Sequence, residues 1–171
     1  MTTVQLIVTI VAGLGAVAAL YGMYGAPGGK RALKAIDPDF EWPDMCFHYD
    51  GLRLRRTFER LGDEGRRLLR HLWLTDYGFI ACLLIVMLAV GRNVAGGTVF
   101  ETILLIAAIT RAALDALENA LLLACCRKHP AFSDRLAGFA GWVTSTKFVA
   151  MGVWVATLFA RLMLRAFGMF A

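Results

Sequence analysis

The chain alternates between long apolar runs and shorter polar connections. Four apolar runs, over residues 4–25, 74–90, 102–126 and 136–164, contain few charged residues. A hydrocarbon core about 30 Å thick is crossed by roughly 20 helical residues, and the four runs approach or exceed that length. The pattern predicts an all-α protein in which residues 1–171 form a single membrane domain, a four-transmembrane-helix bundle.

The connection over residues 26–73 is the longest polar segment. Pro27, Gly28 and Gly29 break the first apolar run. The stretch 37–44 is acidic and interrupted by prolines, so we expect it to be irregular. Its aromatic residues indicate a position on the membrane surface or on a partner.

An amphipathic helix is predicted between the first two spans. It begins at Asp50 as the N-cap, places Leu54, Phe58 and Leu61 on one face, and is closed by Gly62. A basic amphipathic helix of this kind typically lies at a membrane interface, although docking on an acidic partner is an alternative. The residues expected to contact lipid headgroups are Arg53, Arg55, Arg56, Arg60, Arg66 and Arg67.

Composition and charge agree with a membrane protein. The chain is 58% hydrophobic, against roughly 45–50% in soluble domains. Lys and Arg number ten in the first connection, one in the second and three in the third. The positive-inside rule therefore predicts that the first and third connections face the cytoplasm or matrix and that both termini face the opposite side, in a bacterial plasma membrane or a mitochondrial inner membrane. The net charge of +5 is explained by these loops, so we expect no nucleic acid partner.

The four cysteines, at positions 46, 82, 125 and 126, show neither a disulfide framework nor metal-ligand spacing. Acylation of the adjacent pair that closes the third run is an alternative. We therefore expect no metal site and no cofactor, with bound lipid as the candidate ligand.

The third apolar run carries the most informative residues. Arg111, Asp115, Glu118 and Asn119 are separated by three, four and seven positions, so they share one helical face. Ionisable groups in hydrocarbon are costly and normally turn toward partners, water or a ligand. This face therefore predicts either a structural polar cluster or a functional site.

Two further charged residues reach a comparable depth on other spans. Asp76 opens the second span and Lys147 lies about eleven residues into the fourth. The predicted buried network thus comprises Asp76, Arg111, Asp115, Glu118, Asn119 and Lys147. Mutual neutralisation of its charges is one interpretation. The other is that Asp115 or Glu118 acts as a proton relay or general acid, although no HExxH, GxSxG or phosphate-binding loop accompanies them.

The order and spacing of these residues resemble an uncharacterised group of bacterial four-helix integral membrane proteins. The resemblance covers about residues 45–160 and is carried by Leu61-Gly62-x-x-Gly65-Arg66, Asp76, Leu114-Asp115-x-x-Glu118-Asn119 and Thr144-x-x-Lys147. It implies the four-helix fold and no particular reaction. The chain departs from the group by having no Pro after Asp76 and by having Arg111 where an apolar residue is expected.

These features favour an integral membrane structural or interaction protein. We expect a non-enzymatic accessory subunit of a larger respiratory or other energy-converting complex, with membrane lipids and other membrane subunits as partners. The alternative is a protein that binds a lipophilic small molecule, an intramembrane acid-base enzyme, or a small proton-coupled transporter that uses Asp115 and Glu118. Binding of a lipophilic molecule predicts a cavity between the second, third and fourth spans.

Overall fold

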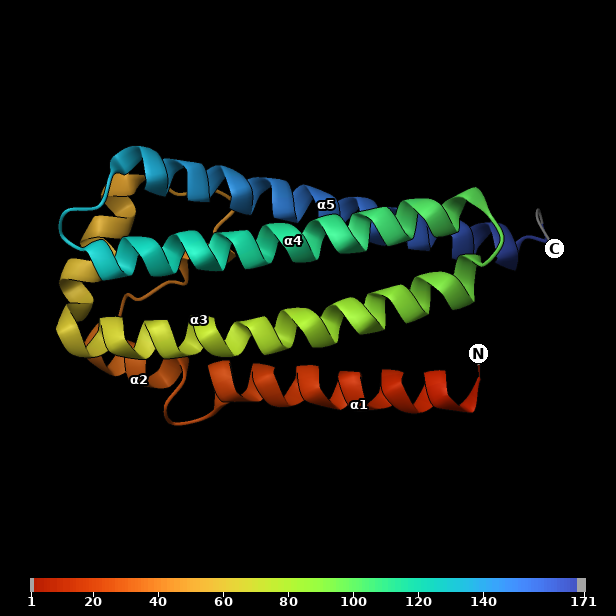
Figure 1. Ribbon diagram of the computed structural model, residues 1–171, viewed down its shortest axis with the longest axis horizontal. Helices are drawn as coiled ribbons and strands as arrows, with labels where there is room; N and C mark the ends of the chain where they lie inside the picture. The colour runs from red at the N-terminus through yellow and green to blue at the C-terminus, as the bar shows by residue number, and fades with distance from the viewer. Residues whose placement is uncertain (1, 169–171) are drawn as a thin grey trace.

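The computed structural model describes residues 2–168, and within that range every regular element is a helix (Figure 1). The elements are α1 (Thr3–Leu20), a π-helical turn (Tyr21–Gly25), α2 (Lys30–Ile36), a 3-10 turn (Pro43–Met45), α3 (Gly51–Ala95), α4 (Val99–Lys128) and α5 (Asp134–Ala166). The predicted all-α class is confirmed. The first predicted span covers α1 and the π-helical turn, and each of the other three falls inside a long helix, the second being the distal part of α3.

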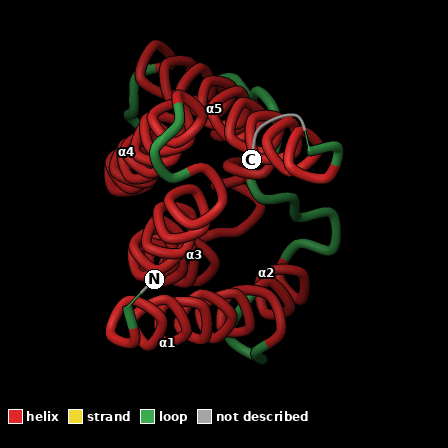
Figure 2. The backbone as a smooth tube through the Cα atoms, turned by 90° about the vertical axis from the view of Figure 1, so that its right-hand side faces the viewer, coloured by secondary structure: helices red, strands yellow, loops and turns green. Residues whose placement is uncertain are grey.

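The long helices run alternately in opposite directions (Figure 1). Seen end-on, α3 lies between α1 and the pair formed by α4 and α5 (Figure 2). Packing follows this order, because α4 contacts α5 and α3 most, while α1 packs mainly on α3. Helix α1 begins and α5 ends at the same end of the bundle, opposite the connection that contains α2 (Figure 1).

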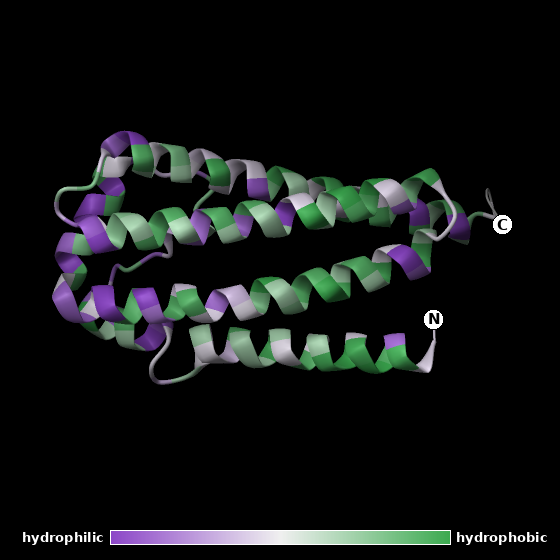
Figure 3. Cartoon of the chain, in the orientation of Figure 1, coloured by the Kyte–Doolittle hydropathy of each residue, from purple (hydrophilic) through white to green (hydrophobic). Residues whose placement is uncertain are grey.

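Three helical segments in the described part of the chain are long and apolar enough to cross a membrane: Thr3–Ile36, Gly51–Ala95 and Asp134–Ala166. Helix α4 has 30 residues, enough length to span, but it carries Arg111, Asp115 and Glu118 in its middle. Hydrophilic residues otherwise gather at the end of the bundle that holds α2 and the start of α3 (Figure 3). The structure thus has the helix lengths and composition of a membrane protein.

Gly62 divides α3 into two parts. Its φ of 61° and ψ of −165° belong to a region that only glycine adopts readily. The first part begins at Asp50, whose side chain accepts a hydrogen bond from the Arg53 N–H at 2.8 Å, and crosses the end of the bundle (Figure 1). The predicted helix start and the predicted break at Gly62 are both confirmed.

The apolar face of this first part is covered by the protein itself. Leu54, Phe58 and Leu61 are at most 2% exposed, and the Phe58 ring packs edge-on against Trp73 and Phe132. This face therefore contacts protein, while the interfacial position of the helix stays a prediction. The chain folds the helix back over the bundle, where a protein core covers the same apolar side chains.

The segment between α2 and α3 is irregular apart from its 3-10 turn, as expected, but its predicted location is wrong. Phe40, Trp42 and Tyr49 are buried in the core of this chain instead of lying on a membrane surface or a partner. We call residues 42–49 the core loop. It passes so close to α5 that a Cβ added to Gly141 would lie 2.0 Å from the Tyr49 carbonyl oxygen, so the close approach requires glycine.

Candidate functional site

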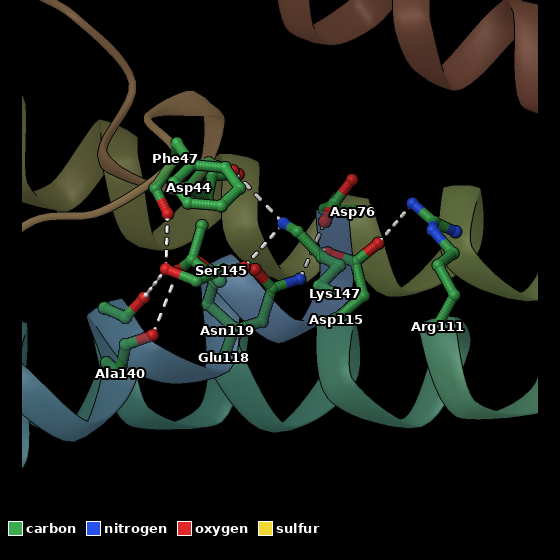
Figure 4. Close-up of polar contacts among 12 residues, drawn as sticks. Asp44, Phe47, Asp76, Arg111, Asp115, Glu118, Asn119, Ala140, Ser145 and Lys147 are labelled. Carbon is green, nitrogen blue, oxygen red and sulfur yellow. Dashed lines mark hydrogen bonds and ion pairs between the residues drawn. The ribbon is translucent and has the colours of Figure 1, made fainter. Parts of the chain in front are cut away.

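Lys147 on α5 lies at the centre of a buried polar cluster (Figure 4). Its Nζ donates to Glu118 Oε2 at 2.5 Å, to Asp115 Oδ1 at 3.0 Å and to the Asp44 carbonyl oxygen at 3.1 Å. An ammonium group has three donors, so all of them are used. Lys147 therefore joins α5, α4 and the core loop.

Arg111 and Asp115 form an ion pair one helical turn apart on α4. Asp115 thus lies between two cations, Arg111 and Lys147. Both residues of the α4 pair are buried. The Arg111 Nη1 atom is also buried, and it has no hydrogen-bond partner.

Glu118 is completely buried, with an exposed fraction of 0%. Its Oε1 accepts hydrogen bonds from the Thr144 hydroxyl and, at 3.4 Å, from the Tyr49 hydroxyl. Its Oε2 faces Lys147. Every oxygen of this carboxylate is therefore engaged by groups from α5 or the core loop.

Asp76 and Asn119 link α3 to α4. The Asn119 side-chain N–H donates to Asp76 Oδ2 at 2.8 Å, and Asp76 is only 8% exposed. The other carboxylate oxygen of Asp76 points away from Asn119 (Figure 4). The structure therefore gathers all six residues of the predicted network, but in the described chain Asp76 forms no ion pair with Arg111 or Lys147.

Asp44 belongs to the same cluster and was missed by the sequence-based prediction. Its Oδ1 is buried without a hydrogen-bond partner, although other parts of the residue are accessible. Burial raises the pKa of the Asp44 carboxyl, against the opposing effect of Lys147, and repulsion from Asp115 raises it further. The acidic, Pro-interrupted composition around Asp44 resembles a surface loop, so only the neighbouring Phe40 and Trp42 could have signalled burial.

A second hydrogen bond, besides the one from Lys147, holds the core loop beside the cluster. The Ser145 hydroxyl donates to the Phe47 carbonyl oxygen at 2.6 Å and lies on α5, two residues before Lys147 (Figure 4). Asp44 is thereby held against the helix that supplies the central cation.

A cavity of about 330 Å³ opens beside the cluster. One wall is charged and contains Asp44, Asp76, Arg111, Asp115 and Lys147. The remaining walls are mainly apolar or aromatic and include Met23, Tyr24, Trp42, Trp73, Phe79 and Phe148. The cavity lies among α3, α4 and α5, where a lipophilic ligand was predicted to bind, and α1 and the core loop complete it.

The two candidate catalytic carboxylates differ in their access to this cavity. Asp115 lines it, whereas Glu118 is not among the lining residues. Glu118 lies behind the wall, enclosed by Lys147, Thr144 and Tyr49. Of the pair, only Asp115 is placed to meet a ligand in the cavity.

The arginines predicted to bind lipid headgroups lie around the first part of α3. Four of the six form ion pairs within the chain: Arg53 with Glu41 at 2.5 Å, Arg55 with Asp134 at 2.9 Å, Arg60 with Asp37 at 2.8 Å and Arg66 with Asp63 at 2.5 Å. Arg56 and Arg67 are exposed. Exposed ion pairs are worth only about 0–1 kcal/mol each. Arg55 and Arg66 are held more firmly, because they also donate to the Phe132 and Phe58 carbonyl oxygens at 3.2 and 2.9 Å. Headgroup binding stays a prediction.

Residues 2–168 contain no group of three His, Cys, Asp or Glu side chains arranged to hold a metal ion. All four cysteines are free thiols. Comparison of the chain with protein-family models, with curated proteins and with solved structures finds no match. The resemblance to bacterial four-helix membrane proteins therefore stays a prediction.

Proposed function

We propose that this chain is a multi-pass integral membrane protein that binds a lipophilic small molecule with a polar head in the cavity among α1, α3, α4 and α5. The observation that carries the proposal is the contrast between the cavity walls. Aromatic and Met side chains form most of the lining, and one wall bears five charged residues. Small-molecule sites combine an apolar lining with a few convergent polar groups, and their volumes begin at about 300 Å³.

Two atoms on the charged wall support a ligand with a polar head. Asp44 Oδ1 and Arg111 Nη1 are buried and have no hydrogen-bond partner in the described chain. A buried polar atom without a partner costs about 1–3 kcal/mol. A ligand head that donates a hydrogen bond to Asp44 Oδ1 would remove the cost of that atom, while the apolar part of the ligand contacts the aromatic walls.

The proposal includes four membrane spans, with α4 as the third. Arg111, Asp115 and Glu118 all face the protein interior, so α4 can present an apolar surface to lipid despite its charges. The Lys- and Arg-rich end of the bundle is assigned to the cytoplasmic or matrix side, and the ends of α1 and α5 to the opposite side. A bacterial plasma membrane or a mitochondrial inner membrane fits this topology.

Asp115 and Glu118 serve in this proposal to hold the bundle together. Both are engaged by cations, and Glu118 is also engaged by two hydroxyls. Acid-base catalysis and proton-coupled transport remain alternatives, but the two carboxylates predicted to serve them, Asp115 and Glu118, are both engaged in ion pairs. The accessory-subunit hypothesis also stays open, because the exposed apolar side chains of α1 suit lipid and a partner helix equally well.

The test fills the cavity and measures what co-purifies. In the variant Leu83→Phe/Met151→Phe, larger side chains replace two lining residues on α3 and α5. In the control Leu74→Phe/Leu162→Phe, Phe replaces two residues on these helices that are 51% and 42% exposed. Full-length protein in nanodiscs is extracted, and its lipophilic molecules are quantified by mass spectrometry.

We expect a lipophilic species that co-purifies with the wild type and the control to be lost from the cavity-filling variant. Equal amounts of every co-purified lipophile in both variants would reject binding in this cavity. A stoichiometric protein partner in the same sample, present with both variants, would favour the accessory-subunit hypothesis instead.

A further inference from the structure

We propose that the polar head of the bound molecule is cationic, so that the ligand is a lipophilic ammonium compound whose charge is matched by Asp44 and Asp76. This inference rests on the proposed function, because it specifies the ligand of the same cavity. Three observations carry it: the charge balance of the wall, the free atoms of the two carboxyls, and the aromatic rings beside them.

The charges of the cluster do not cancel. Arg111 and Lys147 are matched by Asp115 and Glu118, through ion pairs that use both cations. Asp44 and Asp76 remain, and both line the cavity. Four carboxyl groups against two cations leave an excess of two potential negative charges. An anionic head would meet this excess as repulsion, whereas an ammonium head would reduce it.

The two remaining carboxyls have oxygens that can accept hydrogen bonds from such a head. One oxygen of Asp76 is taken by Asn119, and the other points away from it (Figure 4). Asp44 Oδ1 is buried and makes no hydrogen bond of regular geometry, although the Trp73 indole N–H interacts with the same carboxyl. Lys147 has no spare donor for either group, since its three donors are used elsewhere.

Aromatic rings complete the environment of a cation. Phe79 and Phe148 already face Arg111 and Lys147, at 6.0 and 5.4 Å from the ring centres. Trp42 and Trp73 line the same cavity. Tryptophan is the strongest of the cation–π partners, and it acts within about 6 Å of the ring centroid. Trp42 is also held in place by Phe40 and Tyr24, whose ring centroids lie 5.4 and 5.8 Å away.

The same two tryptophans provide the assay. The chain has four Trp residues, so the background Trp142→Phe/Trp154→Phe leaves indole fluorescence only from Trp42 and Trp73. Full-length protein in nanodiscs is titrated with three probes that share a bromoalkyl chain, whose bromine quenches indole fluorescence: ω-bromoundecylammonium, ω-bromoundecanol and ω-bromoundecanoate. The Leu83→Phe/Met151→Phe change in this background measures quenching by probe that is merely dissolved in the bilayer.

We expect the ammonium probe to bind about tenfold or more tightly than the alcohol and the carboxylate, since only the ammonium head carries a charge opposite to that of the two carboxylates. Asp76→Asn keeps an oxygen that accepts from Asn119 but lacks the charge, so it should abolish this preference. Asp39→Asn, at an exposed position of the same connection as Asp44, should preserve it.

The outcomes separate the two proposals. If the alcohol or the carboxylate binds as tightly as the ammonium probe, or if Asp76→Asn keeps the preference, the cationic head is wrong and lipophile binding stands. If all three probes quench wild-type and cavity-filled protein equally, the cavity binds none of them and both proposals are overturned.

Discussion

Replacing Lys147 with Met tests whether the buried cluster holds the bundle together. Methionine keeps an unbranched side chain of similar length and removes the charge with its three hydrogen bonds. Three acceptors then lose a donor: Glu118 Oε2, Asp115 Oδ1 and the Asp44 carbonyl oxygen. The change therefore acts on α4, α5 and the core loop together.

The expected loss of stability follows from the hydrogen-bond and ion-pair partners that each carboxylate keeps in the variant. Asp115 keeps Arg111 as a counterion. Glu118 keeps only the hydroxyls of Thr144 and Tyr49, and it is completely buried. Removing one partner of a buried ion pair costs about 3–5 kcal/mol, mainly because a charge is left without compensation. We expect Lys147→Met to lower the free energy of unfolding by about that amount.

Glu118→Gln completes a double-mutant cycle with Lys147→Met. In the double variant no charge is left on Glu118 without its Lys147 partner. We therefore expect its loss of unfolding free energy to be about 1–3 kcal/mol smaller than the sum of the losses in the two single variants. The free energies are measured by reversible unfolding of the full chain in mixed micelles titrated with dodecyl sulfate, followed by circular dichroism. Lys34→Met, at an exposed position of α2, is the control and should change stability by less than about 0.5 kcal/mol.

Two results would refute the reasoning. The first is a cost for Lys147→Met no greater than that of Lys34→Met, which would mean that water or lipid headgroups replace the lost contacts. The second is a double variant at least as unstable as the two single variants added together. In that case the pair formed by Lys147 and Glu118 would contribute no coupling energy.

Three further changes test other parts of the structure by the same unfolding assay. Gly141→Ala should cost about 1–3 kcal/mol by overpacking, because its Cβ would collide with the Tyr49 carbonyl. The control Gly138→Ala should cost nothing, because a Cβ there has no atom within 4 Å. Equal losses in the two variants would contradict the close contact. Gly62→Ala should cost about 1–3 kcal/mol through backbone strain, and a neutral effect would contradict the break in α3. Asp44→Asn should stabilise at neutral pH. The folded state holds the proton of Asp44 more tightly, since burial raises its pKa, so the wild type loses stability as pH rises above the unfolded value of about 3.9. The advantage of Asn should therefore vanish below that pH, and a constant difference across the titration would contradict a buried carboxyl.

Periodicity explains which features of the fold could be predicted. The apolar runs and the face shared by Arg111, Asp115 and Glu118 follow directly from helical spacing. Placing Lys147 near that face required only the rise per residue of about 1.5 Å and the alternation of short connections. The break at Gly62 followed from glycine itself, because few other residues tolerate its backbone angles.

The remaining features depend on the path of an irregular segment. The core loop has no period, so its sequence does not indicate which way its side chains point. Its position is fixed by contacts far away in the sequence, such as Ser145 with Phe47 and Gly141 with Tyr49. For this reason the sequence does not assign Asp44 to the cluster, and it wrongly indicates the membrane surface or a partner as the location of Phe40 and Trp42.

The contacts of Lys147 connect the stability of the bundle to the shape of the cavity. Two of its hydrogen bonds hold α4 to α5, and the third holds the backbone of Asp44. Because the same cation satisfies Asp115 and Glu118, it leaves the Asp44 and Asp76 carboxyls facing the cavity without an ion pair in the described chain. Cohesion of the bundle does not require a charge at these two positions, because neither carboxyl forms an ion pair that joins two helices of the described chain. Their presence on the cavity wall is what a ligand with a cationic head explains.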